Sequence, residues 1–427
     1  MALRRRPSIL RDAVLDSLKA QYLNAVKMRR RFSARQSTNS HQKVRFDLPV
    51  PFQSPSSPPA DDGRPRLPAT ISLDTATSYI KAILDEGSTA LPRMACPNQD
   101  YSRYASLKPA RFDYPHFLTK PSSKTPYFFA LNLRNNMAIL PRLLASVIQV
   151  IRFLGPENCA LSIVEGNSPD GTADVLSLLE QYLDSRLRTF FVLRDSTNPK
   201  GDERFELLAK LRQKALEPML AEPNRYRDAT VAFINDVAIC PDDILELLYQ
   251  RKHLGADMTC AMDWNDLGGP NSTFYDIYIS RSIKGDTFFN IPMTGGSWSE
   301  SGNLFWNDPD TRARLDAYLP FQVFACWNGA VTFTAKPLVK RQVVFRKAQE
   351  GECHNGEPEI FCKDLWRKGY GKIAVVPSVN LAYADNVGQK LHDEKGTASQ
   401  IVARTKHLND LIEWQGPPEK VRLYLNM

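Results

Sequence analysis

From Tyr127 onward, short apolar runs alternate with longer segments in which apolar residues recur every three to four positions. Short continuous apolar runs are typical of strands that are buried on both faces of a sheet. The pattern predicts strands over residues 127–132, 160–164, 189–193, 230–234 and 257–262. It predicts helices over residues 139–153, 172–183 and 204–216, and one that begins at Pro241. This alternation predicts an α/β fold with a mostly parallel, Rossmann-like sheet flanked by helices.

The rest of the chain divides by composition. Residues 1–35 predict a basic amphipathic arm, and residues 36–70 predict a Ser/Pro-rich linker. Residues 71–126 predict an N-terminal extension that packs on the main domain, with a helix over residues 72–85. The strand–helix alternation occupies residues 127–267, an irregular half with loops is expected over 268–390, and residues 391–427 form a C-terminal tail.

Composition and charge favour a globular protein and argue against a nucleic-acid-binding protein or a transmembrane helix. Hydrophobic residues make up 43% and charged residues 24%, which suits a globular protein with a sizeable core. Much of the net charge of +8 lies in the arm, which either contacts a membrane surface or remains a solvated tail. No nucleic-acid partner is expected, because basic and aromatic residues do not interleave later in the chain. The sequence contains no apolar run long enough for a transmembrane helix and no signal-peptide core.

The seven cysteines include no CxxC pair, so a structural zinc site is not expected. Cys159, Cys240 and Cys260 lie in apolar runs and are predicted to be small buried hydrophobes. Cys353 and Cys362 are candidates for a disulfide in an oxidising compartment.

Polar residues follow the predicted strands, and the carboxyl ends of parallel strands meet at one edge of a sheet. We therefore expect a convergent rim that contains Asn132, Glu165, Asp195, Asn235, Asp236 and Asp263. A carboxylate such as Asp236, delivered by a buried strand, is the kind of ligand that Mn²⁺ or Mg²⁺ prefers. A helix or turn cap explains an acid at this position equally well. The first strand is not followed by GxGxxG, which argues against a dinucleotide-binding fold.

Three further segments carry candidate chemistry. Arg204 and Arg212 share a predicted helix, where they either present cations to a diphosphate or form a solvated basic face. Trp327 and Asn328 lie on a Gly-containing turn and either contact a sugar or belong to the core. Glu357 lies in an acid-rich stretch before an apolar helix, which would hold the acid rigidly, although a solvated loop is the alternative.

Ordered motifs extend over residues 72–385. They include Phe128-Phe129-Ala130-Leu131-Asn132, Glu165-Gly166-Asn167-Ser168-Pro169-Asp170-Gly171-Thr172, Phe233-Ile234-Asn235-Asp236-Val237, Phe274-Tyr275-Asp276, Arg281, Cys326-Trp327-Asn328-Gly329, Gly356-Glu357 and Lys363-Asp364-Leu365-Trp366. By these motifs the chain resembles the fungal capsule-associated α-1,3-mannosyltransferases of the cryptococcal type, family 69 of the glycosyltransferases.

The resemblance implies a GT-A-like fold, GDP-mannose as donor, a Mn²⁺ or Mg²⁺ cofactor and α-1,3 transfer of mannose with retention. It implies that Asp236 is the metal-binding acid and that Asn132 and Glu165 lie near the nucleotide. Glu357 matches a late acid of the family, but the stretch reads Gly-Glu-Pro where Ser-Glu-Cys is expected, which puts a thiol role there in doubt. Family members are usually anchored in the Golgi by an N-terminal transmembrane helix, which is not found in this sequence.

These observations give a set of expected roles. Residues 127–267 are expected to bind the nucleotide sugar through Asn132, Glu165, Arg204, Arg212 and Asn235, with Asp236 on the metal. Residues 268–390 are expected to bind a glycan or glycolipid acceptor along Trp327 and Asn328, and Glu357 and Asp263 are the candidate catalytic acids. One alternative is a non-catalytic accessory protein in polysaccharide assembly or export. A nucleotidyltransferase is disfavoured, because no Gly-rich basic loop follows the first strand.

Overall fold

The structure is a computed structural model that describes residues 70–97, 100–109, 124–267, 271–291, 300–352 and 356–421. The basic arm and nearly all of the linker expected from the sequence lie outside the described residues. All the described residues belong to one compact unit.

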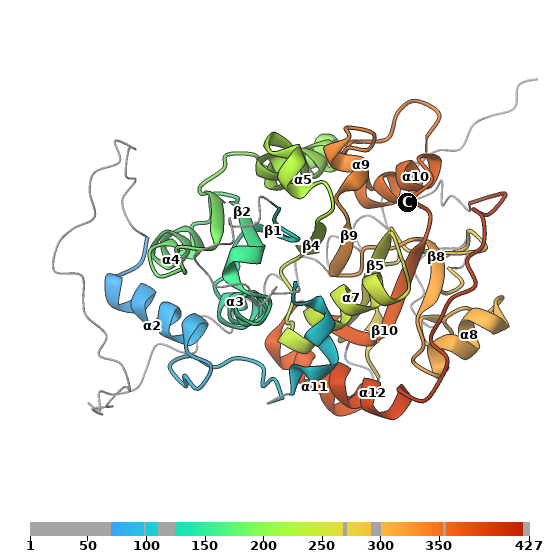
Figure 1. Cartoon of the computed structure of the whole chain (residues 1–427), viewed down its shortest axis with the longest axis horizontal. Coiled ribbons are helices and arrows are strands. Elements are labelled where there is room, and N and C mark those ends of the chain that lie inside the picture. Colours follow the sequence, from blue (N-terminus) through green and yellow to red (C-terminus); the bar gives the residue numbers. More distant parts are fainter. Residues whose placement is uncertain are drawn as a thin grey trace, which may run out of the picture. The chain divides into compact units, whose positions relative to one another are not determined.

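A mixed sheet of ten strands forms the centre of this unit (Figure 1). Its strands follow the order β3-β2-β1-β4-β9-β5-β10-β8-β7, and β6 pairs with β5. The strands are β1 (Tyr127–Leu133), β2 (Cys159–Glu165), β3 (Arg188–Val192), β4 (Thr230–Ile234), β5 (Met258–Asn265), β6 (Thr273–Phe274), β7 (Arg281–Ser282), β8 (Phe321–Ala325), β9 (Ala330–Thr334) and β10 (Ile373–Ala382).

Helices cover both faces of the sheet, as the alternating pattern predicted. Figure 1 shows α5 (Arg204–Ala221), α9 (Lys336–Val339) and α10 (Glu357–Arg367) on one side. On the other side lie α3 (Leu140–Leu154), α7 (Pro241–His253), α11 (Asp385–Lys395) and α12 (Ala398–Thr405). The remaining helices are α2 (Leu73–Leu84), α4 (Thr172–Glu180), α6 (Pro223–Tyr226), α8 (Pro309–Asp316), and the short 3₁₀ turns Tyr101–Leu107, Pro156–Asn158 and Gly201–Glu203.

The predicted α/β fold is confirmed, but the sheet is mixed rather than mostly parallel, because β6, β7, β8 and β9 pair antiparallel with their neighbours. The reason for the confirmed elements lies in local sequence. Strand β4 is buried at every position, which is why its sequence reads as a continuous apolar run. Helix α7 begins with Pro241 in its first turn, and Asp243 accepts the backbone N–H of Cys240 at 2.8 Å. Helix α3 ends at Gly155, whose φ of 91° side-chain-bearing residues rarely adopt.

The second half of the chain contributes more to the sheet than the sequence indicated. Strand β9 inserts antiparallel between β4 and β5, and β10 pairs in parallel with β5 on its other side. Asp236, which follows β4, and Asp263, near the end of β5, therefore lie on strands that β9 separates. A short apolar run indicates a strand, but it does not show which strands pair with one another.

The expectations for two cysteines are wrong. Cys240 and Cys260 are buried, but each forms a disulfide, Cys96–Cys240 and Cys260–Cys326. Cys362 is a free, buried thiol rather than the partner of Cys353, which lies outside the described residues. Cys159 is a free buried residue, as predicted. Sequence spacing does not encode cysteine pairing, because the partners are brought together only by the fold.

Candidate functional site

The candidate site lies at the carboxyl edge of β4, where Asn235 and Asp236 follow the strand. The Asn235 N–H donates to Gly329 O at 2.9 Å, which ties this end of β4 to the turn before β9. Asn136, a buried residue of the loop after β1, donates from Nδ2 to Asp236 Oδ2 at 3.0 Å. Two loops that are distant in sequence therefore hold Asn235 and Asp236 in place.

Arg212 of α5 contacts three other predicted site residues. Its Nε donates to Glu357 Oε1 at 2.8 Å, and its Nη1 lies 3.4 Å from Asn235 Oδ1. Its guanidinium lies 4.3 Å from the centre of the Trp327 ring, and Trp327 Nε1 donates to Asn235 Oδ1 at 3.1 Å. The structure thus brings Arg212, Asn235, Trp327 and Glu357 into one network of charge and aromatic contacts.

A pair of carboxylates lies near this network, at the end of β5. Asp263 is fully buried and accepts the Tyr383 hydroxyl on Oδ2 at 2.8 Å, whereas its Oδ1 has no hydrogen-bond partner among the described residues. Asp276 accepts the Asn328 N–H on Oδ2 at 3.1 Å. Burial raises the pKa of Asp276 to about 6, and burial together with the charge of Asp276 raises the pKa of Asp263.

Tyr275 lies close to the acids of the site. Burial raises the pKa of Tyr275 to about 12, and the charges of Asp263, Asp276 and Asp236 add to the rise. The sequence indicated Asp236 and Asp263 as site residues but missed Asp276, although the motif Phe274-Tyr275-Asp276 contains it.

Two predicted nucleotide-contacting residues bind the protein's own backbone. Glu165 is fully buried, and its two carboxylate oxygens accept the N–H groups of Ser168 at 2.7 Å and Arg194 at 2.9 Å. Asn132, with its amide oriented so that both ends are paired, donates to Leu211 O and accepts from Arg212 N, each at 3.2 Å. Glu165 therefore organises the loops after β2 and β3, and Asn132 fixes β1 to the turn of α5 that carries Arg212.

Trp327 and Asn328 shape the site from beneath. Trp327 is 2% exposed and Asn328 is fully buried. The Asn328 amide accepts the Ser280 hydroxyl at 2.7 Å and donates to Ala261 O at 2.9 Å, which holds a turn with a φ of 49°. Their side chains therefore support the candidate site from inside the protein and are not part of its exposed surface. Arg204 is an exposed residue at the start of α5, where its Nη1 donates to Pro199 O at 3.3 Å.

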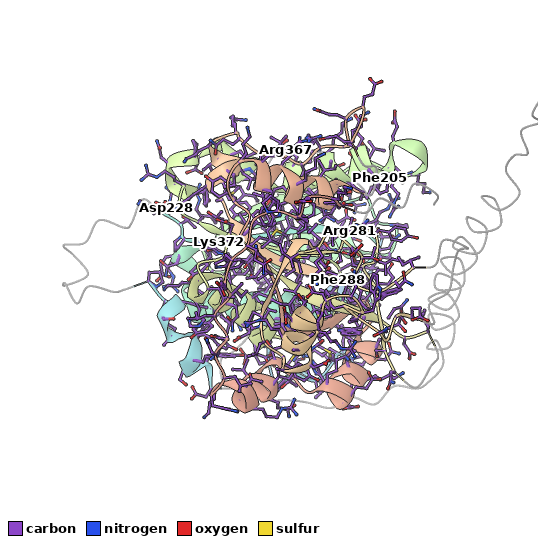
Figure 2. The ribbon with its side chains drawn as sticks, turned by 90° about the vertical axis from the view of Figure 1, so that its right-hand side faces the viewer. Phe205, Asp228, Arg281, Phe288, Arg367 and Lys372 are labelled. Atoms are coloured by element: carbon purple, nitrogen blue, oxygen red, sulfur yellow. A yellow bond between two sulfur atoms is a disulfide. The ribbon has the colours of Figure 1, made fainter. Side chains whose placement is uncertain are left out.

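Helix α10 adds a second acid–arginine contact. Arg281, labelled in Figure 2, is 1% exposed, and its Nη2 lies 3.7 Å from Glu359 Oε2. Glu357 and Glu359, both in the first turn of α10, thus face arginines that come from different parts of the chain. These contacts anchor the acidic first turn of α10 against α5 and β7.

Another group of potential metal ligands does not suit a metal. Side-chain atoms of Cys240, Asp243 and His392 lie within 4.8 Å of one another among the described residues. The Cys240 sulfur is bonded to Cys96, and Asp243 caps α7 through the Cys240 N–H. A disulfide sulfur offers no thiolate, so the oxygen ligands at the carboxyl edge are the better candidates.

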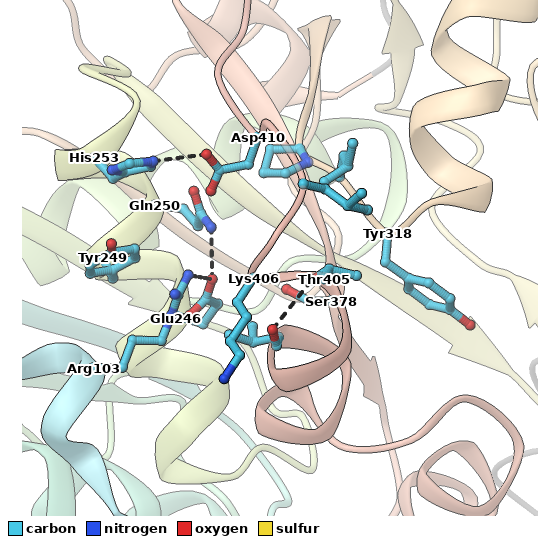
Figure 3. Close-up of a pocket in the computed structure, with 14 residues that line it drawn as sticks. Arg103, Glu246, Tyr249, Gln250, His253, Tyr318, Ser378, Thr405, Lys406 and Asp410 are labelled. Atoms are coloured by element: carbon cyan, nitrogen blue, oxygen red, sulfur yellow. Dashed lines mark hydrogen bonds and ion pairs between the residues drawn. The ribbon is translucent and has the colours of Figure 1, made fainter.

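A polar pocket lies at the opposite end of α7 (Figure 3). Arg103 donates to both carboxylate oxygens of Glu246, and the His253 ring lies 2.9 Å from Asp410 Oδ1. Arg103 and Glu246 therefore neutralise one another, and His253 and Asp410 are partners within the protein. The candidate site is therefore the carboxyl edge and not this pocket.

The chain is similar to known proteins over more than half of its length. Residues 126–364 match the family described as Cryptococcal mannosyltransferase 1. The chain is 36% identical over 325 residues to "Alpha-1,3-mannosyltransferase CMT1" of Cryptococcus neoformans var. neoformans serotype D, which covers 71% of this chain and 69% of that protein.

Solved structures show more distant likenesses. TarS from S. aureus, residues 1–349, matches with a TM-score of 0.34 and 13% identity over 67% of each chain. The mannosyltransferase PcManGT from Pyrobaculum calidifontis, in complex with GDP-Man and Mn²⁺, matches with a TM-score of 0.34 and 10% identity over 71% of this chain and 74% of that chain. With its match to the family model over residues 126–364 and its similarity to the Cryptococcus mannosyltransferase, the chain belongs to the cryptococcal mannosyltransferase family and is a glycosyltransferase.

Proposed function

We propose that the protein transfers mannose from GDP-mannose to a hydroxyl group of a glycan or glycolipid, in a metal-dependent reaction that forms an α-1,3 linkage with retention. Its similarity to an α-1,3-mannosyltransferase supports the transferred sugar and the linkage. The observation that carries the metal-dependent site is the buried carboxylate of Asp263, whose Oδ1 has no hydrogen-bond partner among the described residues.

The acids at the carboxyl edge suit a hard divalent cation. A buried carboxylate oxygen without a donor, such as Asp263 Oδ1, is costly, and a cation at that position would satisfy it. Asp236 is the residue that would hold Mn²⁺ or Mg²⁺, which prefer oxygen ligands, and Asp263 is a second candidate ligand. When bound, such a cation neutralises the charge that develops on the diphosphate leaving group.

The residues of the Arg212 network position the reacting groups. Glu357 accepts from Arg212 at 2.8 Å, so this acid fixes the guanidinium rather than acting as a free base. Arg212 in turn supplies a fixed positive charge close to Asn235 and Asp236, where the diphosphate would bind. Arg204, exposed at the first turn of α5, is a further cation available to the donor.

The transfer itself needs no protein base. The bond between C1 of mannose and the diphosphate oxygen breaks, and both electrons leave with the diphosphate. The acceptor oxygen bonds to C1 on the same face, and its proton passes to a leaving phosphate oxygen. Asn132 and Glu165 contribute indirectly, because they fix the backbone of the loops that would hold the nucleotide.

We also propose that the protein acts in the secretory pathway, as Golgi members of the family do. The two disulfides support this location, because such bonds form and persist in oxidising compartments. Among the described residues, none of the helices is both long and apolar enough to cross a membrane. The basic arm over residues 1–35 is our candidate for contact with the membrane surface.

A donor panel tests the proposal. Thermal unfolding is measured with GDP-mannose, GDP-glucose and UDP-glucose, each with Mn²⁺ or with EDTA. A ligand at 100 times its dissociation constant adds about 2.7 kcal/mol of stability. We expect stabilisation by GDP-mannose with Mn²⁺, and release of GDP during incubation. A larger shift from UDP-glucose would contradict the donor, and binding without any release of GDP or transfer would favour the accessory role.

A further inference from the structure

Exposed aromatic side chains occur beside the candidate site. Tyr275 is 43% exposed and Tyr278 is 42% exposed, whereas the residues between and after them, Ile277 and Ile279, are buried. The Ser280 N–H donates to Asp276 O at 3.3 Å, so these residues form a tight turn. Tyr275 and Tyr278 are therefore the large side chains of this turn that reach the surface, although each is also partly buried.

This turn lies between two of the candidate acids, Asp263 and Glu357. At its start, the Tyr275 N–H donates to Asp263 O at 3.0 Å, and the Tyr275 ring lies 5.0 Å from that of Tyr383. At its end, Ile279 packs so closely on Gly356 that a Cβ there would lie 2.7 Å from Ile279 Cδ1. Gly356 directly precedes Glu357, so the two tyrosines lie between Asp263 and Glu357.

The position of the turn separates it from the proposed nucleotide site. Strands β1, β2 and β3 lie on one side of β4, whereas β5 and β6, which lead into the turn, lie on the other side. In open α/β sheets the nucleotide binds where strand order reverses, here at β1. The tyrosines therefore lie on the other side of β4 from the strands that would bind the nucleotide.

The side chains have the chemistry of a sugar platform. Aromatic faces pack against the C–H surface of a pyranose ring, and a phenol hydroxyl bonds to sugar hydroxyls. A phenol has an ordinary pKa of about 10 and is protonated at neutral pH, so both tyrosines are hydrogen-bond donors. Neighbouring large aromatic groups that remain exposed next to a candidate site point to a ligand that covers them.

We propose that Tyr275 and Tyr278 form the platform on which a sugar ring of the acceptor stacks, so that they determine acceptor specificity. This inference rests on the proposed transfer of mannose. It predicts that recognition is directed at a carbohydrate ring next to the reacting hydroxyl, and not at the alkyl part of a lipid.

Kinetics with a panel of hexose disaccharides and alkyl glycosides tests the inference. The variant Tyr278→Ala removes the ring, Tyr278→Phe keeps the ring and removes the hydroxyl, and Leu408→Ala is the control. Leu408 is 39% exposed and lies after α12. Loss of an aromatic contact is worth roughly threefold to tenfold. We expect Tyr278→Ala to raise the KM for the acceptor by about this factor and to change the KM for GDP-mannose less than twofold.

The outcomes separate the inference from the function on which it rests. Wild-type protein that transfers no sugar from GDP-mannose would overturn the proposed function itself. If the wild type is active and Tyr278→Ala keeps the wild-type KM for the acceptor, the platform is overturned. The same holds if the alkyl chain alone sets the acceptor KM. Retention of affinity in Tyr278→Phe but not in Tyr278→Ala would support stacking.

Discussion

The ion pair of Arg212 and Glu357 allows a quantitative test of how the site is held together. The side chains are 12% and 3% exposed, and Nε lies 2.8 Å from Oε1. Arg212→Met keeps the unbranched apolar part of the side chain but removes the guanidinium, which leaves the Glu357 carboxylate buried without its partner. Removing one partner of a buried pair costs about 3–5 kcal/mol. The lost contact of the guanidinium with Trp327, 4.3 Å away, contributes about 0.5–2 kcal/mol of the same destabilisation.

The assay is the free energy of unfolding, obtained from urea denaturation of the wild type and the variants. We expect Arg212→Met to lose about 3–5 kcal/mol, and the double variant Arg212→Met with Glu357→Leu to recover most of this loss, because it leaves no unpaired charge. The double variant should remain inactive, since the positive charge is absent. Arg227→Met, which breaks the exposed pair with Asp228, should change stability by about 0.5 kcal/mol or less.

The reasoning would be refuted if Arg212→Met cost no more than the exposed control. It would also be refuted if the double variant were as unstable as the sum of the two single variants. Either result would mean that water or another cation compensates Glu357 and that the pair does not organise the site.

Three other predictions follow from the contacts. The variant Cys326→Ser opens a disulfide with a sequence separation of 66, which should lower stability by about 4 kcal/mol, measured by thermal unfolding, and should weaken the adjacent Trp327 turn. Glu165→Gln can accept only one of the two N–H groups that Glu165 accepts, and should lower stability by about 1–3 kcal/mol and weaken GDP binding, measured by calorimetry. Burial raises the pKa of Asp385 to about 6 from an ordinary 3.8, so the folded state binds more protons than the unfolded state between these values, and stability falls as pH rises through this window. Asp385→Asn should therefore flatten the pH dependence of the melting temperature between about pH 4 and 6.

Local patterns predicted much of the fold. The strand over residues 230–234 has the bounds that the structure gives to β4, because a strand buried on both faces leaves a continuous apolar signature. Helix α2 begins after the Ser72 cap and ends before Asp85, as the predicted range of residues 72–85 indicates. The placement of β9 between β4 and β5 was not predictable, because strand pairing depends on contacts that are distant in sequence.

The candidate site was predictable in its residue types but not in its contacts. The sequence indicated Arg212, Asn235, Trp327 and Glu357 separately, and only the fold shows that they form one network. Asp276 was missed as a site residue because it follows a strand of two residues, which leaves no periodic signal. Burial explains why Glu165 binds backbone groups, since a buried carboxylate must satisfy its oxygens.

Transfer from GDP-mannose by the variant Asp236→Asn tests the central proposal most directly. Asparagine keeps the oxygen that accepts from Asn136 at 3.0 Å, so the variant removes the charge and little else. Asp316→Asn, on the exposed surface of α8, is the matched control. Since a metal contributes several kcal/mol to the transition state, we predict that Asp236→Asn lowers kcat at least about 100-fold and loses Mn²⁺ binding by calorimetry, while the control remains active. Undiminished transfer by Asp236→Asn in the presence of Mn²⁺ would contradict the assignment.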